Sequence, residues 1–310
     1  MTSGFDNNDY SILIGNLLND TQYVAVSNMG KMGGLRKHAE VLVRKILNIG
    51  SDSSLMLGEV NLNSRNTAVA NGLSRLYFPG TTICDDFIRM VKDINQLARQ
   101  GNHTQRTTDF TNEEITQVED LIFDLYAMMF IIYFMNYPVD LYFSSVILHD
   151  FSYLPPIIRY KTWNYLYNMD KYNLQVANKL CLSIIKTEGK AAALKWLNDN
   201  EEDIRKIPYP SEDEIIDYAL KCGVEVAPGQ YAVSLRLNLF NNMYDLLLDK
   251  INDPNTSVNE RGKMYSNFEE AVEYFNKRIP FYESTSAYSD FSSLISFVFL
   301  GRKTKSELEK

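Results

Sequence analysis

Apolar residues recur at three- and four-residue steps along most of the chain, the spacing that places side chains on one face of an α-helix. The clearest case is segment 82–100, where one apolar stripe is separated by polar and charged residues. The stripe consists of Phe87, Met90, Val91, Ile94, Leu97 and Ala98. This pattern predicts an amphipathic helix that packs against a core.

The same periodicity, with capping residues and with glycine and proline breaks, predicts helices throughout the chain and therefore a mainly α fold. In the first half the predicted helices are 8–18, 22–49 with a loosened region at Gly30, Gly33 and Gly34, 66–77, 82–100 and 111–137. In the second half they are 157–168, 173–187, 190–197, 211–223, 267–277 and 290–300, followed by a frayed charged tail. Residues 231–240 alternate as a strand would but run into a helical period, and we predict a helix with an extended start.

The sequence changes character at Pro138, where a loop-like, aromatic stretch begins and runs to Pro156. This change predicts two domains, a helical bundle at 1–137 and a second helical domain at 138–310. The segment 121–137 just before it is very apolar, but it contains Asp124 and has no basic flank. We therefore predict a central core helix there and no membrane association.

Charge and cysteine usage narrow the classes of protein. Lys and Arg total 31 against 39 Asp and Glu, and the net charge of -8 argues against a surface that attracts nucleic acid everywhere. The three cysteines, Cys84, Cys181 and Cys222, are far apart in the sequence and read as small buried residues in a reducing compartment. The first residues lack the pattern of a signal peptide, so a cytoplasmic protein is predicted.

Three stretches of the first half, GGLRKHAEVLVRKIL, INQLARQGN and TNEEITQVEDLIFDLYAMMF, occur in an order that resembles a known helical domain. That domain lies beside the nuclease and motor parts of type I restriction R subunits and in other prokaryotic defence proteins. It is grouped with the HEPN superfamily, many of whose members cut RNA or act in abortive infection. The resemblance covers roughly residues 30–136 and implies a HEPN-like bundle that forms a homodimer.

The resemblance also implies an active site. In the superfamily an arginine is followed one to two helical turns later by a histidine, and two copies pair across a homodimer. Here Arg99 and His103 form such a pair, at a tighter spacing than usual. The resemblance implies that His103 is the general acid/base, that Arg99 holds the scissile phosphate and that Asn102 positions the backbone.

An alignment on Gly101 and Asn102 gives a different result, because the family's histidine position then holds Arg106 and its arginine position holds Ala98. A basic cluster on the helix 22–49 adds further cations, Arg36, Lys37, Arg44 and Lys45, with Glu40 among them. Arg36 and Lys37, with Arg106, are the candidate phosphate-binding residues. The alternative for the basic cluster, a solvated helix face, is favoured by the charge pattern.

Other chemistry is less well represented. His149-Asp150 is similar to the metal-binding pair of HD-type phosphohydrolases, but with His38 and His103 the sequence has only three histidines, so no metal site is predicted. His38 lies beside its helix's buried stripe and is predicted to be packed and hydrogen-bonded. The glycine-rich run 30–34 lacks the spacing of a P-loop, and no cofactor is predicted.

Aromatic residues are dense after residue 138, and beside Arg159 and Lys161 they could stack RNA bases, although a core role is favoured. Two functional hypotheses follow. The first is a defence protein of the abortive-infection type whose first half is a metal-independent ribonuclease and whose second half recognises a partner. The second is a non-catalytic scaffold that dimerises and binds a protein partner.

Overall fold

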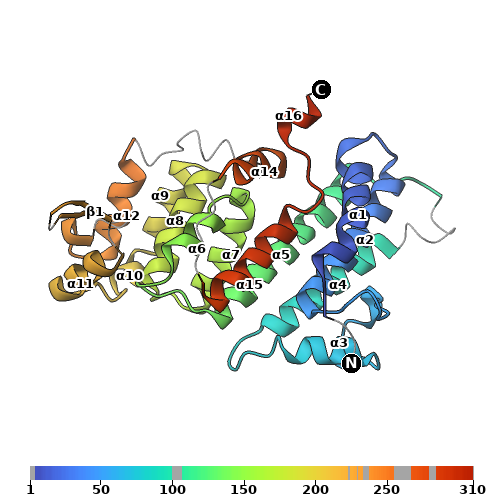
Figure 1. Cartoon of the computed structure of the whole chain (residues 1–310), viewed down its shortest axis with the longest axis horizontal. Coiled ribbons are helices and arrows are strands. Elements are labelled where there is room, and N and C mark those ends of the chain that lie inside the picture. Colours follow the sequence, from blue (N-terminus) through green and yellow to red (C-terminus); the bar gives the residue numbers. More distant parts are fainter. Residues whose placement is uncertain are drawn as a thin grey trace. The chain divides into compact units, whose positions relative to one another are not determined.

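The computed structural model describes residues 4–99, 107–222, 224–228, 230–232, 237–254, 267–278 and 284–309. Its helices form two compact units (Figure 1). Unit 1 comprises Met1–Met135 and Thr285–Lys310, and unit 2 comprises Asn136–Ser284. The predicted mainly α fold is confirmed.

Unit 1 contains most of the helices predicted for the first half, together with the last two helices of the chain. In chain order they are α1 (Asn7–Leu18), the π-helical turn η1 (Asn19–Tyr23), α2 (Asn28–Leu47), the 3-10 turn η2 (Leu57–Glu59), α3 (Thr67–Ser74), α4 (Ile83–Arg99), α5 (Asn112–Asn136), α15 (Ser286–Val298) and α16 (Lys305–Leu308).

Helix α2 begins at Asn28, where the Ser27 hydroxyl accepts a hydrogen bond from the Gly30 amide at 3.2 Å. It continues without interruption through the three glycines, so the predicted loosened region is wrong. A Cβ at Gly34 would lie 2.3 Å from Cγ2 of Thr21 in η1, which shows that close packing of these two elements needs a glycine there.

Helix α5 is the core of unit 1. It begins with the predicted capping box, in which the Thr111 amide donates to Glu114 at 2.8 Å and the Glu114 amide donates to the Thr111 hydroxyl at 3.2 Å. Every residue from 125 to 131 is buried, which requires partners on all sides of the helix. None of the helices in the described ranges, α5 included, combines the length and apolar character that a membrane span requires.

Helix α15, the last but one in the chain, is one of the partners of α5 (Figure 1). The ring of Phe291 lies 6.0 Å from that of Phe130 and 5.5 Å from that of Tyr133, and the Tyr133 hydroxyl donates to the Ala287 carbonyl at 3.0 Å. The two-domain prediction placed residues 285–310 in the second domain, whereas in the structure they belong to unit 1. The apolar face of α15 shows that it is buried but does not show against which helix.

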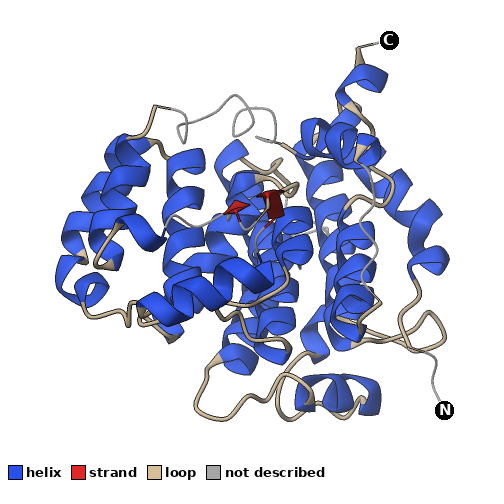
Figure 2. Ribbon diagram, turned by 60° about the vertical axis from the view of Figure 1, so that its left-hand side comes forward, coloured by secondary structure: helices blue, strands red, loops and turns tan. Residues whose placement is uncertain are grey.

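Unit 2 is built from short helices and one small hairpin. The helices are α6 (Ser145–Phe151), α7 (Pro156–Met169), α8 (Leu174–Thr187), α9 (Lys190–Asp199), α10 (Glu201–Arg205), α11 (Glu212–Cys222), the 3-10 turn η4 (Leu237–Leu239), α12 (Met243–Asn252) and α14 (Phe268–Lys277). The strands β1 (Val224–Ala227) and β2 (Gln230–Ala232) pair antiparallel and are drawn in red in Figure 2.

Unit 2 confirms some predictions and departs from others. The predicted extended start of segment 231–240 is found as strand β2, and the next α-helix begins at Met243, where the Asn242 side chain accepts from the Asp245 amide at 3.0 Å. Helices α6 and α10 were not predicted, because segments of seven and five residues are too short to show a helical period. The tail predicted to be frayed contains α16, capped by Thr304 and Glu307.

Candidate functional site

Of the predicted catalytic residues, the structure describes Arg99. Arg99 is the last residue of that helix and its side chain is exposed. Asn102, His103 and Arg106 lie outside the described residues. The geometry of the predicted site can therefore be followed only on the α4 side.

Arg36 is brought close to this helix end by the packing of α2 against α4. Its guanidinium donates a hydrogen bond to the side-chain oxygen of Asn95 at 3.3 Å. Asn95 precedes Arg99 by one helical turn, so both side chains lie on the same side of α4. Asn95 is not among the predicted site residues, and its position one turn before Arg99 is the signal that could have identified it.

Lys37 follows Arg36 in α2 and is exposed, whereas Arg36 is half-buried. Glu40 is the acidic residue beside them. Burial raises the pKa of Glu40, against the attraction of Arg44, Arg36 and Lys37, which lowers it. The described part of the site is thus a cationic edge with one half-buried carboxyl group.

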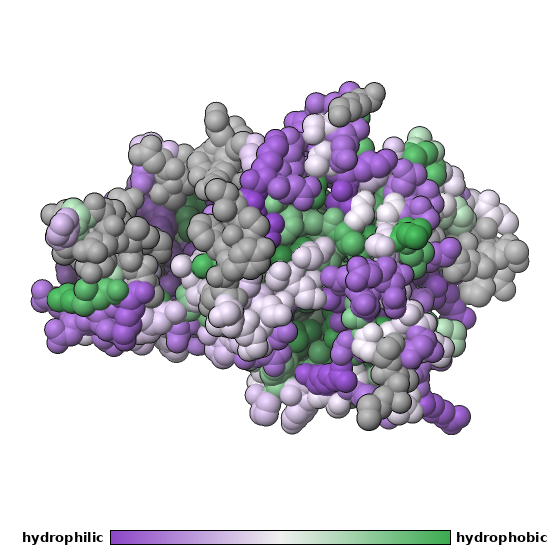
Figure 3. Space-filling view, in the orientation of Figure 1, coloured by the Kyte–Doolittle hydropathy of each residue, from purple (hydrophilic) through white to green (hydrophobic). Residues whose placement is uncertain are grey.

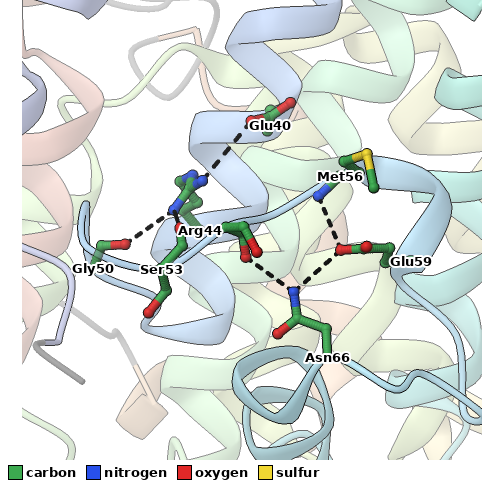
Figure 4. A network of polar contacts seen from close by, with 8 residues as sticks. Glu40, Arg44, Gly50, Ser53, Met56, Glu59 and Asn66 are labelled. Carbon is green, nitrogen blue, oxygen red and sulfur yellow. Dashed lines mark hydrogen bonds and ion pairs between the residues drawn. The ribbon is translucent and has the colours of Figure 1, made fainter. Parts of the chain in front are cut away.

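Arg44 and Lys45, the other cations of the basic cluster, are engaged inside unit 1. The Arg44 guanidinium donates to the carbonyls of Gly50 at 3.0 Å and Ser53 at 2.8 Å, and it lies 4.0 Å from the Glu40 carboxylate (Figure 4). Lys45 donates to Asn7 at 3.0 Å and to the Ser293 hydroxyl at 3.1 Å. The favoured interpretation as a solvated face is therefore wrong for these two residues.

A second group of contacts holds the loop that follows α2 (Figure 4). The Asn66 amide donates to the Ser54 carbonyl at 3.0 Å and to the Glu59 carboxylate at 3.1 Å, while its oxygen caps α3. Glu59 also accepts from the Met56 amide at 3.4 Å. This network fixes the loop between α2 and α3, and its polar groups serve the fold.

His38 is packed and hydrogen-bonded, as predicted. It is 3% exposed, and its Nε2 lies 2.9 Å from the Tyr126 hydroxyl. Arg302 donates to the same hydroxyl oxygen at 3.3 Å, which leaves the hydroxyl hydrogen of Tyr126 to be donated to Nε2 of His38. Burial, and secondly Arg302, lowers the pKa of His38 to about 3, which keeps the ring neutral and unsuited to acid/base work near pH 7.

His149 and Asp150 lie in α6 of unit 2. The His149 ring nitrogen Nδ1 is 3.5 Å from one oxygen of the buried Asp150, and Nε of Arg278 is 3.6 Å from the other. The carboxylate thus faces a guanidinium, the kind of counterion that competes with a metal ion. Across the described residues, no group of three or more His, Cys, Asp or Glu side chains is placed to hold a metal.

The aromatic cluster of unit 2 is mostly core. Phe151 and Trp163 stack edge to face at 5.2 Å, and both are nearly fully buried. Arg159, proposed as a possible partner of stacked bases, is itself 5% exposed. Tyr142 is 40% exposed, but its hydroxyl donates to Asp217 at 2.8 Å.

No protein-family model matches this sequence, and neither a curated protein nor a solved structure matches it.

Proposed function

We propose that unit 1 binds RNA through its phosphate groups and cuts it without a metal ion, as the HEPN-like resemblance implies for a cytoplasmic defence protein of the abortive-infection type. The observation that supports this best is the contact of Arg36 with Asn95, one turn before Arg99. This contact holds Arg36 against α4 one turn from Arg99, and Lys37 is the next residue after Arg36 in α2. Guanidinium groups match the geometry of phosphate oxygens, and a local cluster is sufficient to bind them.

The chemistry assigned to the site needs only protein groups. His103 takes the proton from a ribose 2′-hydroxyl, whose oxygen attacks the adjacent phosphorus as the bond from phosphorus to the 5′-oxygen breaks. The protonated His103 then returns that proton to the leaving 5′-oxygen. Arg99 stabilises the charge that develops on the phosphoryl oxygens, with Arg36, Lys37 and Arg106 binding neighbouring phosphates. The products are a 2′,3′-cyclic phosphate and a 5′-hydroxyl. A homodimer supplies two such sites, and Asn102 positions the backbone between Arg99 and His103.

An RNA cleavage assay in EDTA tests this proposal. We expect the wild-type protein to cut single-stranded RNA to cyclic-phosphate ends, and His103→Ala to lose about 10²- to 10⁴-fold in rate, the usual contribution of a general acid or base. Arg99→Ala should lose cleavage as well. Arg89→Ala is the matched control on the same helix, because Arg89 is 68% exposed and pairs with Asp86 away from this end.

RNA binding separates the two halves of the proposal. Replacing Arg36 and Lys37 by glutamine should weaken binding and reduce the slope of log K against log salt by about 0.7 for each lost phosphate contact to a single strand. Cleavage that is the same in wild type and His103→Ala removes the ribonuclease. Binding that is the same in wild type and the double variant removes the phosphate-binding edge.

The second candidate is a non-catalytic scaffold that dimerises and binds a protein partner. The specific observation in its favour is the exposed apolar side of α11 in unit 2, where Ile216 and Leu220 are more than half exposed. Wild-type protein that forms a dimer in sedimentation but neither binds nor cuts RNA would favour this candidate over the first.

A further inference from the structure

Helix α11 of unit 2 has an apolar strip on its outer side. Ile216 is 52% exposed and Leu220 is 57% exposed, and the two are one helical turn apart. Leu239, 60% exposed, lies in η4, which packs against α11. Figure 3 shows this strip at the lower left, bordered by hydrophilic residues.

Acidic residues border the strip. Glu212 and Asp213 are exposed, and they precede Ile216 by four and three residues, which places them on the same side of the helix. Neither makes an ion pair with another residue in the described ranges. Glu214, by contrast, is used in the helix cap, where its carboxylate accepts from the Ser211 amide at 2.8 Å.

The positive charge on this helix is already engaged. Lys221 donates to Asp217 at 2.8 Å, and Asp217 also accepts from the Tyr142 hydroxyl. Acidic residues in the first turn of a helix are stabilised by the helix dipole, which explains their presence in α11 without a partner protein. The dipole does not explain two large apolar side chains in solvent beside them.

We propose that this side of α11 docks a basic amphipathic helix of a partner protein. Two apolar side chains one turn apart fit between the corresponding side chains of a second helix, and carboxylates at the border select lysine and arginine there. A second copy of α11 is a poorer match, because the helix carries Glu212, Asp213, Glu214 and Asp217 against one lysine and two copies would repel. The inference concerns unit 2 and is independent of the RNA chemistry proposed for unit 1.

Fluorescence anisotropy with the full chain tests the proposal. The probe is a labelled 18-residue peptide of lysine, alanine and leucine, about 27 Å long when helical, with leucines at positions i, i+4, i+7 and i+11. A scrambled peptide of the same composition serves for comparison. We expect the amphipathic peptide to bind more tightly than the scrambled one and its binding to weaken with salt.

Variants locate the binding. Ile216→Gln with Leu220→Gln should raise the Kd about tenfold or more, and Glu212→Gln with Asp213→Asn should reduce the salt dependence. Leu194→Gln is the control, because Leu194 is a 37% exposed leucine on another helix of unit 2. Circular dichroism checks that each variant is folded.

Three results would overturn the proposal. Equal binding of the two peptides, or equal binding by wild type and the Ile216/Leu220 variant, excludes α11 as the docking surface. A dimer that dissociates on Leu220→Gln substitution in sedimentation experiments assigns the strip to a second copy of the chain.

Discussion

Acid should destabilise unit 1 through His38. This ring is buried between α2 and α5 and stays neutral in the fold, with a pKa lowered from 6.5 to about 3. The unfolded chain exposes the ring and binds a proton near pH 6.5. Between these two values the unfolded chain holds one more proton than the folded chain, so the free energy of unfolding falls as the pH falls through that window.

The size of the effect follows from the shift. Each pH unit inside the window costs about 1.4 kcal/mol, so lowering the pH from 7.5 to 5 removes about 2 kcal/mol of stability through this residue alone. His38→Gln keeps a polar side chain beside the Tyr126 hydroxyl and removes the titration. The variant should lose about 1 kcal/mol at pH 7.5, where the hydrogen bond is imperfectly replaced, and should lose about 2 kcal/mol less than wild type between pH 7.5 and 5.

The assay must distinguish the two units. Both tryptophans, Trp163 and Trp196, lie in unit 2, so their fluorescence reports that unit. Circular dichroism during urea unfolding reports the helices of both units. The part of the unfolding transition that appears in circular dichroism but not in tryptophan fluorescence is therefore assigned to unit 1. His149→Gln is the control, because it removes a histidine whose side chain is 41% exposed in unit 2. The reasoning is refuted if His38→Gln keeps the same loss of stability between pH 7.5 and 5 as the wild type.

Three further predictions concern the packing of unit 1, each measured by urea unfolding. Gly72→Ala should destabilise unit 1 by about 1–3 kcal/mol, because the added Cβ would lie 2.6 Å from Cβ of Leu47. Gly33→Ala should stabilise it by about 0.5–1 kcal/mol, because a Cβ there has nothing within 4 Å. Equal effects of the two substitutions on the free energy of unfolding would contradict the packing. Arg44→Met should cost about 2–3 kcal/mol by leaving two loop carbonyls without their donor, and an unchanged midpoint would show that water replaces it. Burial lowers the pKa of Lys45 from 10.5 to about 8, so between these values the unfolded chain holds one more proton than the folded chain. The free energy of unfolding of the wild type should therefore rise from about pH 8 to 10 relative to that of Lys45→Met. Parallel pH profiles of the two proteins would contradict this.

Much of the fold follows from local sequence. The stripe of α4 and the all-round apolar character of α5 predict an amphipathic helix and a core helix, and both are found. The capping boxes at Thr111 and Ser211 mark where α5 and α11 begin. These features depend on residues within one or two turns, which a periodic pattern reports directly.

The tertiary partners do not follow in the same way. The periodicity of α15 shows that one face is buried, but not that its Phe291 packs on Phe130 in a helix more than a hundred residues earlier. The Arg302 guanidinium reaches Tyr126 from a tail whose composition indicated fraying. Polarity likewise predicts a charged surface for Arg44, since the backbone carbonyls that it binds are invisible in the amino-acid sequence.

The candidate site likewise has a part that local sequence predicts and a part that depends on tertiary contacts. Arg99 and His103 were selected from sequence because the proposed chemistry needs an arginine and a histidine close together in the chain. The contribution of Arg36 depends on a contact between α2 and α4 that spans 59 residues, and Asn95 acquires a role only through that contact. Arg36 donates its hydrogen bond to a neutral amide and interacts with the Glu40 carboxyl group only through space, whereas Lys221 donates directly to the Asp217 carboxylate. This difference in pairing supports the proposals of an anionic ligand for the α2–α4 edge and of a basic helix for the α11 strip.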